Sequence, residues 1–145
     1  MLIDRGKLEI DQPIAGFSHA VTLGQVMSHR SGIRNYGLCL CFPVWEHQNK
    51  RHFRNINEQV AVIKNSPLLF KPGSDFAYTS LGYNLAGAAI EQASGQPYGT
   101  YMNSVVFQPL GMKRTSLSEA GAAGFYETKA GRYKRAFAVD NSIRW

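Results

Sequence analysis

Apolar residues recur at helical spacing in several stretches of the chain, and turn-forming residues separate these stretches. The first clear case is 21–33, where Thr22 and Gln25 have the spacing of a capping box. A helix starting there would place three apolar side chains on one face, those of Leu23, Val26 and Met27. Gly32 is suited to end it.

A second helix is predicted to begin at Asn55, because Asn55 and Glu58 repeat the capping-box spacing ahead of an apolar stripe. The Asn-Ser-Pro sequence at 65–67 would end it. Between the two helices, residues 35–54 show no periodicity but include several aromatic side chains, which favours a long, partly packed loop.

A third helix is predicted over about Thr79–Ala93, with Gly95 at its end. Its apolar side would consist of Leu81, Leu85, Ala88 and Ala89. Gly82 and Gly87 weaken an isolated helix, yet they let a neighbouring element approach closely.

The C-terminal third of the chain changes character. A short helix is predicted from Pro97, with Pro109 ending it. Beyond it, two short strands are predicted around a turn at 129–131. The pattern therefore predicts a mainly α chain with a small C-terminal β-hairpin, divided into a helical part of about 15–117 and a hairpin region of about 118–145.

Composition fits a folded globular chain, since 44% of the 145 residues are hydrophobic and 18% are charged. No apolar run is long enough to cross a bilayer. The N-terminal segment lacks the apolar stretch of a signal peptide, and no cellular compartment or oligomeric state is predicted.

The net charge of +6 raises the question of nucleic-acid binding. Basic residues gather at 50–54 and 129–135, but no zinc-finger, recognition-helix or RNP pattern accompanies them. A solvated basic surface is therefore favoured, with no nucleic-acid partner.

Cys39 and Cys41, followed by His47 and His52, invite comparison with a zinc site. Structural zinc sites usually separate paired cysteines by two to four residues, and a single intervening residue fits poorly. Apolar thiols and surface histidines are favoured, and neither a metal nor a cofactor is predicted.

Tyr78 lies between the turn at Pro72-Gly73 and the third predicted helix. Its ring can pack beneath the turn, which local sequence alone favours. Alternatively, the positive end of the helix dipole can stabilise developing phenolate character, which would make the hydroxyl a general base.

Three segments in order resemble the serine β-lactamase and penicillin-binding protein superfamily, in its class C, D-alanyl-D-alanine peptidase and esterase branch. They are "HRSGI", "PGSDFAYTSLGYNLAG" and "QPLGMKRTSL", and the terminal "VDNSIRW" is similar to mitochondrial β-lactamase-like serine proteases. The resemblance implies the helical portion of a β-lactamase/transpeptidase-like α+β fold, present here as a partial domain over 1–145.

The family's middle motif, Tyr-x-Asn, falls on Tyr78 and Ser80. The resemblance implies an acid/base role for Tyr78, and it places Ser80 where the family carries an asparagine that contacts substrate. A serine hydroxyl lacks the reach and the two different groups of an amide, which puts penicillin-like substrates in doubt.

The family's nucleophile belongs to a Ser-x-x-Lys motif, and no serine in this sequence is followed by lysine three residues later. The expectation is part of a serine hydrolase of amide, ester or D-Ala peptide bonds, with a small-molecule or peptide substrate, inactive alone. The alternative is a non-catalytic binding module derived from that family.

Overall fold

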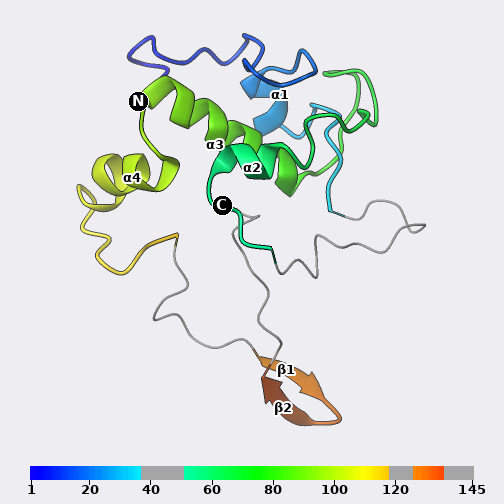
Figure 1. Cartoon of the computed structure of the whole chain (residues 1–145), viewed down its shortest axis with the longest axis vertical. Helices are drawn as coiled ribbons and strands as arrows, with labels where there is room; N and C mark the ends of the chain where they lie inside the picture. Colours follow the sequence, from blue (N-terminus) through cyan, green and yellow to red (C-terminus); the bar gives the residue numbers. More distant parts are fainter. Residues whose placement is uncertain (37–50, 118–125, 136–145) are drawn as a thin grey trace.

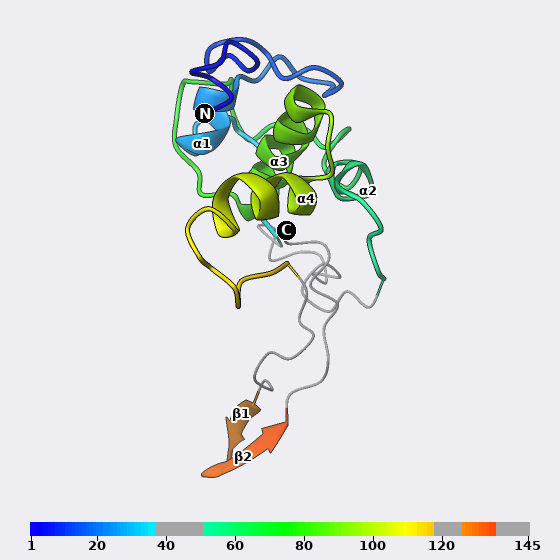
Figure 2. The ribbon, with the colours of Figure 1, turned by 90° about the vertical axis from the view of Figure 1, so that its left-hand side faces the viewer.

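α3 is the helix on which the other helices pack in the computed structural model, which describes residues 1–36, 51–117 and 126–135 (Figure 1). α3 spans Ser80–Ser94 and contacts α1 (Leu23–Met27), α2 (Ile56–Val60) and α4 (Tyr98–Met102). A π-helical segment, η2 (Asn103–Phe107), follows α4 directly. Figure 2 shows α1 and α2 on either side of α3.

The bounds of α3 follow from its caps. The Thr79 hydroxyl accepts a hydrogen bond from the Gly82 N–H, and Gly95 ends the helix in the left-handed region at φ 69°. These bounds agree with the predicted third helix to within one residue. The predicted close approach at Gly87 is also confirmed, because a Cβ there would lie 2.5 Å from the Cδ1 atom of Ile56 in α2.

The capping box predicted for α1 is confirmed. The Gln25 N–H donates to the Thr22 hydroxyl, and the Gln25 side chain accepts from the Thr22 N–H. The helix is shorter than predicted, because its C-cap is Ser28 rather than a residue near Gly32. His29 follows in the left-handed region at φ 58° and turns the chain away from the helix axis.

The second predicted capping box is only half formed. The Asn55 side chain caps α2 by accepting from the Glu58 N–H, but the Glu58 carboxylate accepts from the backbone and guanidinium of Arg54 instead. These hydrogen bonds stabilise the ionised carboxylate and lower the pKa of Glu58 below its ordinary value.

The hydrophobic core lies between α3 and the segments that carry α1 and α2. Its buried members are Ile14, Val21, Leu23, Val26, Ile33, Val60, Ile63, Leu81, Leu85, Ala86 and Ala89. They include most of the apolar stripes predicted for the first three helices, so burial of these stripes holds the helices together. Met27 was predicted on the same face as Leu23 and Val26, but it is exposed, and Ala88 is only partly buried against this core.

Two four-residue strands, β1 (Tyr126–Lys129) and β2 (Arg132–Arg135), pair antiparallel around Ala130-Gly131. They form a sheet of two strands with no other described strand beside it. A two-stranded pair of this kind has little independent stability in water.

The predicted fold class, mainly α with a C-terminal β-hairpin, is wrong. Only 33% of the structure is helical, and no C-terminal hairpin forms a packed part of the described domain. Among the described residues, three of the four α-helices span only five residues each. After α1, the carbonyls of His29, Arg30 and Gly32 bond to the segment 69–80, whereas α2 is followed by locally bonded turns. The division at 117/118 stays a prediction, and most of the predicted loop 35–54 lies outside the described residues.

Within the described ranges, every helix is too short or too polar to traverse a lipid bilayer.

Gly32 supplies a test of the packing. At φ 76° a Cβ there would stand 2.4 Å from the Phe70 carbonyl oxygen, whereas at Gly16, with φ 79°, it would meet nothing within 4 Å. We expect Gly16→Ala to lower the free energy of unfolding by about 1 kcal/mol and Gly32→Ala by about 3 kcal/mol or more. Urea denaturation measures both, and equal losses would contradict the close approach.

Candidate functional site

Backbone hydrogen bonds join the segment 29–35 to the segment 69–80. The Leu69 N–H donates to the Gly32 carbonyl at 2.7 Å, and the Gly73 N–H donates to the Arg30 carbonyl at 2.8 Å. The Arg30 guanidinium returns a bond to the Gly73 carbonyl. These bonds fix the chain that leads into α3, although the two segments lie about forty residues apart in the sequence.

The first turn of α3 is held by side chains of the two segments. Thr79 is fully buried, and its hydroxyl donates to the Arg34 carbonyl at 2.9 Å while capping the helix. The Ser80 N–H donates to the Asn35 side-chain oxygen at 3.0 Å. Helix N-termini carry unsatisfied N–H groups, so these partners both complete the helix and anchor it to the segment 29–35.

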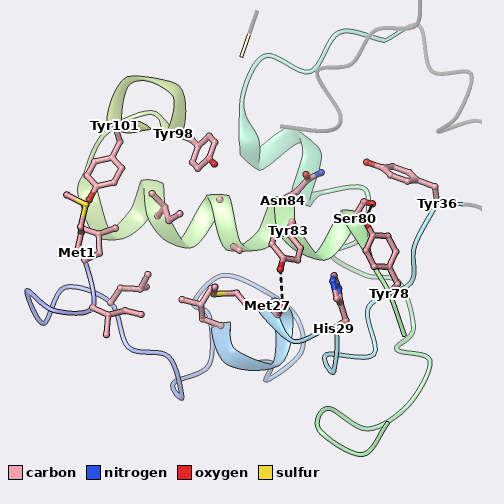
Figure 3. A pocket seen from close by; sticks show the side chains of 17 residues that line it. Met1, Met27, His29, Tyr36, Tyr78, Ser80, Tyr83, Asn84, Tyr98 and Tyr101 are labelled. Carbon is pink, nitrogen blue, oxygen red and sulfur yellow. Dashed lines mark hydrogen bonds between the residues drawn. The ribbon is translucent and has the colours of Figure 1, made fainter. Parts of the chain in front are cut away.

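Tyr78 immediately precedes this capped turn, and 58% of its surface is exposed. Its hydroxyl oxygen accepts a hydrogen bond from the Ser80 hydroxyl at 3.4 Å, which is long for an O–H···O bond. Both side chains line the same groove (Figure 3). The structure thus brings the two predicted site residues together and leaves the phenol accessible.

The groove runs along α3 and has a volume of about 980 Å³. Its polar end, at the start of α3, carries His29, Tyr36, Tyr78 and Ser80, and Figure 3 shows Met1, Tyr98 and Tyr101 toward the other end. Aliphatic side chains form much of the wall, among them Leu2, Ile3, Leu8, Leu23, Met27 and Ile90. No Asp, Glu, Lys or Arg is among the described residues that line it, so the groove suits a neutral, largely apolar group.

Asn84 and His29 are polar groove residues close to Tyr78 and Ser80 that the sequence did not predict as site residues. Asn84 is buried and lies one turn after Ser80, so the i, i+4 spacing placed it on the same helix face. His29 lies in the "HRSGI" segment, but no sequence pattern pairs it with Tyr78. The structure places the two rings 4.6 Å apart, centroid to centroid.

The structure describes only one of the four residues considered as zinc ligands. Cys39, Cys41 and His47 lie outside the described residues, and His52 is exposed. In the part of the chain that the structure covers, no group of three or more His, Cys, Asp or Glu residues is arranged to hold a metal ion.

The model of the family described as Beta-lactamase matches residues 1–143. The chain therefore belongs to the Beta-lactamase family. The match takes in both segments that form the site and the whole of α3, so Tyr78 and Ser80 lie within the family domain.

Individual relatives agree with this assignment. The mouse (Mus musculus) protein "Serine beta-lactamase-like protein LACTB, mitochondrial" is 40% identical over an alignment of 102 residues, and the match covers 66% of this chain and 18% of that protein. Esterase EstB of Burkholderia gladioli is 30% identical over 130 residues, covering 77% of this chain and 33% of the esterase. The chain spans a third or less of these relatives.

The crystal structure of a penicillin-binding protein from Bacillus halodurans is similar in fold. It superposes with a TM-score of 0.75 at 25% identity, covering 99% of this chain and 47% of that one. The chain therefore corresponds to part of a β-lactamase-like domain.

Removing the Thr79 hydroxyl tests how the site is held. We expect Thr79→Val to lower the free energy of unfolding by about 2–3 kcal/mol, since both the Gly82 N–H and the Arg34 carbonyl lose their partner. Thr79→Ser keeps the hydroxyl and should cost about 1 kcal/mol. Urea denaturation compares them, and a Val variant no less stable than the Ser variant would show that the cap does not anchor α3.

Proposed function

We propose that this chain is the part of a β-lactamase-like serine hydrolase that carries its tyrosine acid/base group. The reaction would be acyl transfer through a covalent acyl-enzyme, with an amide, ester or D-Ala peptide as substrate. Tyr78 would exchange protons with the reacting groups, and Ser80 would hydrogen-bond beside it.

The observation that carries this proposal is the position of the Tyr78 hydroxyl. It opens onto a groove at the N-terminal end of a fifteen-residue helix, and its hydrogen bond among the described residues is a long one from Ser80. The helix dipole favours negative charge at that end, which supports phenolate character during proton transfer. A packed structural tyrosine would instead be enclosed, with a close partner for its hydroxyl.

Ser80 and Asn84 together support a polar contact for substrate. Ser80 takes the motif position that the family fills with asparagine, and the Asn84 amide lies one helical turn further along the same groove. An amide offers both a donor and an acceptor, which one hydroxyl cannot offer simultaneously in the same geometry.

The 145 residues alone are proposed to be inactive. Acyl transfer requires a nucleophile, its base and an oxyanion hole in one place, and the sequence has no Ser-x-x-Lys motif. Binding or a lone acid/base group can leave only a modest residual rate, on the order of a hundredfold over that in water.

A non-catalytic binding module of the same family is the second candidate. Its support is the groove itself. The described side chains that line it are mostly apolar or aromatic, with no Asp, Glu, Lys or Arg among them, and such walls fit a neutral ligand whether or not a reaction follows.

A fluorophosphonate probe separates an active chain from an inactive one. We expect the intact mass of the 145-residue chain to stay unchanged after incubation, because no serine has an activating lysine. A serine hydrolase of known activity serves as the positive control under the same conditions. Stoichiometric labelling of any serine in this chain would mean that the nucleophile is present after all, and the proposal of inactivity would fall.

A further inference from the structure

His29 holds the backbone on both sides of Tyr78. Its carbonyl oxygen accepts the N–H of Ala77 at 3.0 Å, and its ring Nδ1 accepts the N–H of Thr79 at 3.3 Å. The residues immediately before and after Tyr78 are therefore bonded to one histidine, fifty residues earlier in the chain.

The His29 ring also packs against the aromatic side chains around it. Its centroid lies 4.6 Å from that of Tyr78 and 5.4 Å from that of Tyr83, at interplanar angles of 46° and 42°. The Phe76 ring meets it edge-on at 5.9 Å. Contacts on several sides fix the orientation of the imidazole, and the imidazole in turn limits where the Tyr78 ring can lie.

The backbone conformation of His29 supports a specific role. A φ of 58° is uncommon for a residue with a Cβ and costs about 1 kcal/mol or more. The chain turns at His29, and this turn lets His29 accept hydrogen bonds from Ala77 and Thr79. These bonds offset the cost of the left-handed backbone conformation.

We propose that His29, in its neutral form with the proton on Nε2, is the positioning residue that sets Tyr78 at the mouth of the groove. An Nδ1 that accepts an N–H carries no proton, which defines this tautomer. A contribution of His29 to catalysis rests on the proposed acid/base function of Tyr78. The physical coupling between the His29 and Tyr78 side chains does not depend on that function.

Protonation of His29 would break this arrangement. A protonated Nδ1 is a donor, so it could no longer accept the hydrogen bond from the Thr79 N–H. The added positive charge would also lie beside the positive end of the α3 dipole.

No nearby carboxylate offsets that charge among the described residues that line the groove. The titratable groups in ring contact with His29 are the phenols of Tyr78 and Tyr83. Arg30 is bonded to the Gly73 carbonyl, and the Asp75 carboxylate accepts the N–H of Phe76. Acidification should therefore loosen the hold on Tyr78.

The test is a pH titration of the full 145-residue chain by NMR, with ¹³C-labelled histidine and tyrosine rings and ¹⁵N-labelled amides. The ring signals of Tyr78 and the amide signal of Thr79 should move with the same midpoint as the His29 ring. Tyr98 lines the same groove without a ring contact to His29 and should show no such step. A Tyr78 signal that does not follow His29 would overturn the inference.

Three variants sharpen the result. His29→Asn tolerates the left-handed conformation and keeps an acceptor but cannot titrate, so it should abolish the step at Tyr78. His29→Phe keeps a ring without an acceptor and should raise the hydrogen-exchange rate of the Thr79 amide about tenfold at neutral pH. His19→Asn, a histidine bonded instead to the Ser66 carbonyl, should leave the step unchanged.

Persistence of the Tyr78 step in His29→Asn would also overturn the inference. This readout needs no turnover. An absent step therefore refutes the coupling while leaving the role proposed for Tyr78 in place, and serine labelling by fluorophosphonate refutes the inactivity without affecting the coupling.

Discussion

The hydrogen-bonded pairing of residues 29–35 with residues 69–80 is the interaction on which the site depends. It determines where the chain enters α3, and its side-chain bonds complete the first turn of that helix. Burial of Thr79 within the pairing leaves Tyr78, one residue earlier, directed toward the groove. Each bond contributes modestly by itself, so the geometry results from the set acting together.

Because this pairing fixes the start of α3, it also determines which face of the helix packs in the core and which face lines the groove. One side of the helix packs its apolar stripe against α1 and α2, and groove residues such as Tyr83, Asn84 and Ile90 lie on another. The polar groups of the groove gather where the helix begins, beside the paired segments, while its aliphatic wall extends toward α4 (Figure 3). The Tyr78 hydroxyl, for which we propose an acid/base role, thus stands at one end of a largely apolar groove. Such a groove fits a neutral group.

Sequence reasoning succeeded where the physical signal is local. The Thr22–Gln25 box, the bounds of α3 and the close approach at Gly87 all depend on residues within one or two helical turns, or on a missing side chain. These features could be predicted because short spacings fix their geometry. Tyr78 and Ser80 were singled out by the resemblance to the family's Tyr-x-Asn motif, and their role in a site stays a prediction.

The parts that could not be predicted depend on contacts between distant segments. Gly32 was expected to end a helix, whereas it admits the Phe70 carbonyl from a segment forty residues away. Nothing in the sequence around His29 indicated that its ring would accept a hydrogen bond from Thr79, fifty residues later. The first predicted helix ended early for the same reason, because the carbonyls of His29, Arg30 and Gly32 accept hydrogen bonds from the segment 69–80 instead.

Hydrogen exchange of the amides of Leu69, Gly73, Ala77 and Thr79 tests the paired segments most directly. Each of these amides donates to residues 29–32. They should share a common, high opening free energy, and Gly32→Ala should lower it for all four together. Fast exchange at Ala77 and Thr79 while the interior of α3 stays protected would contradict the account, because α3 would then be folded without the pairing that is said to position Tyr78.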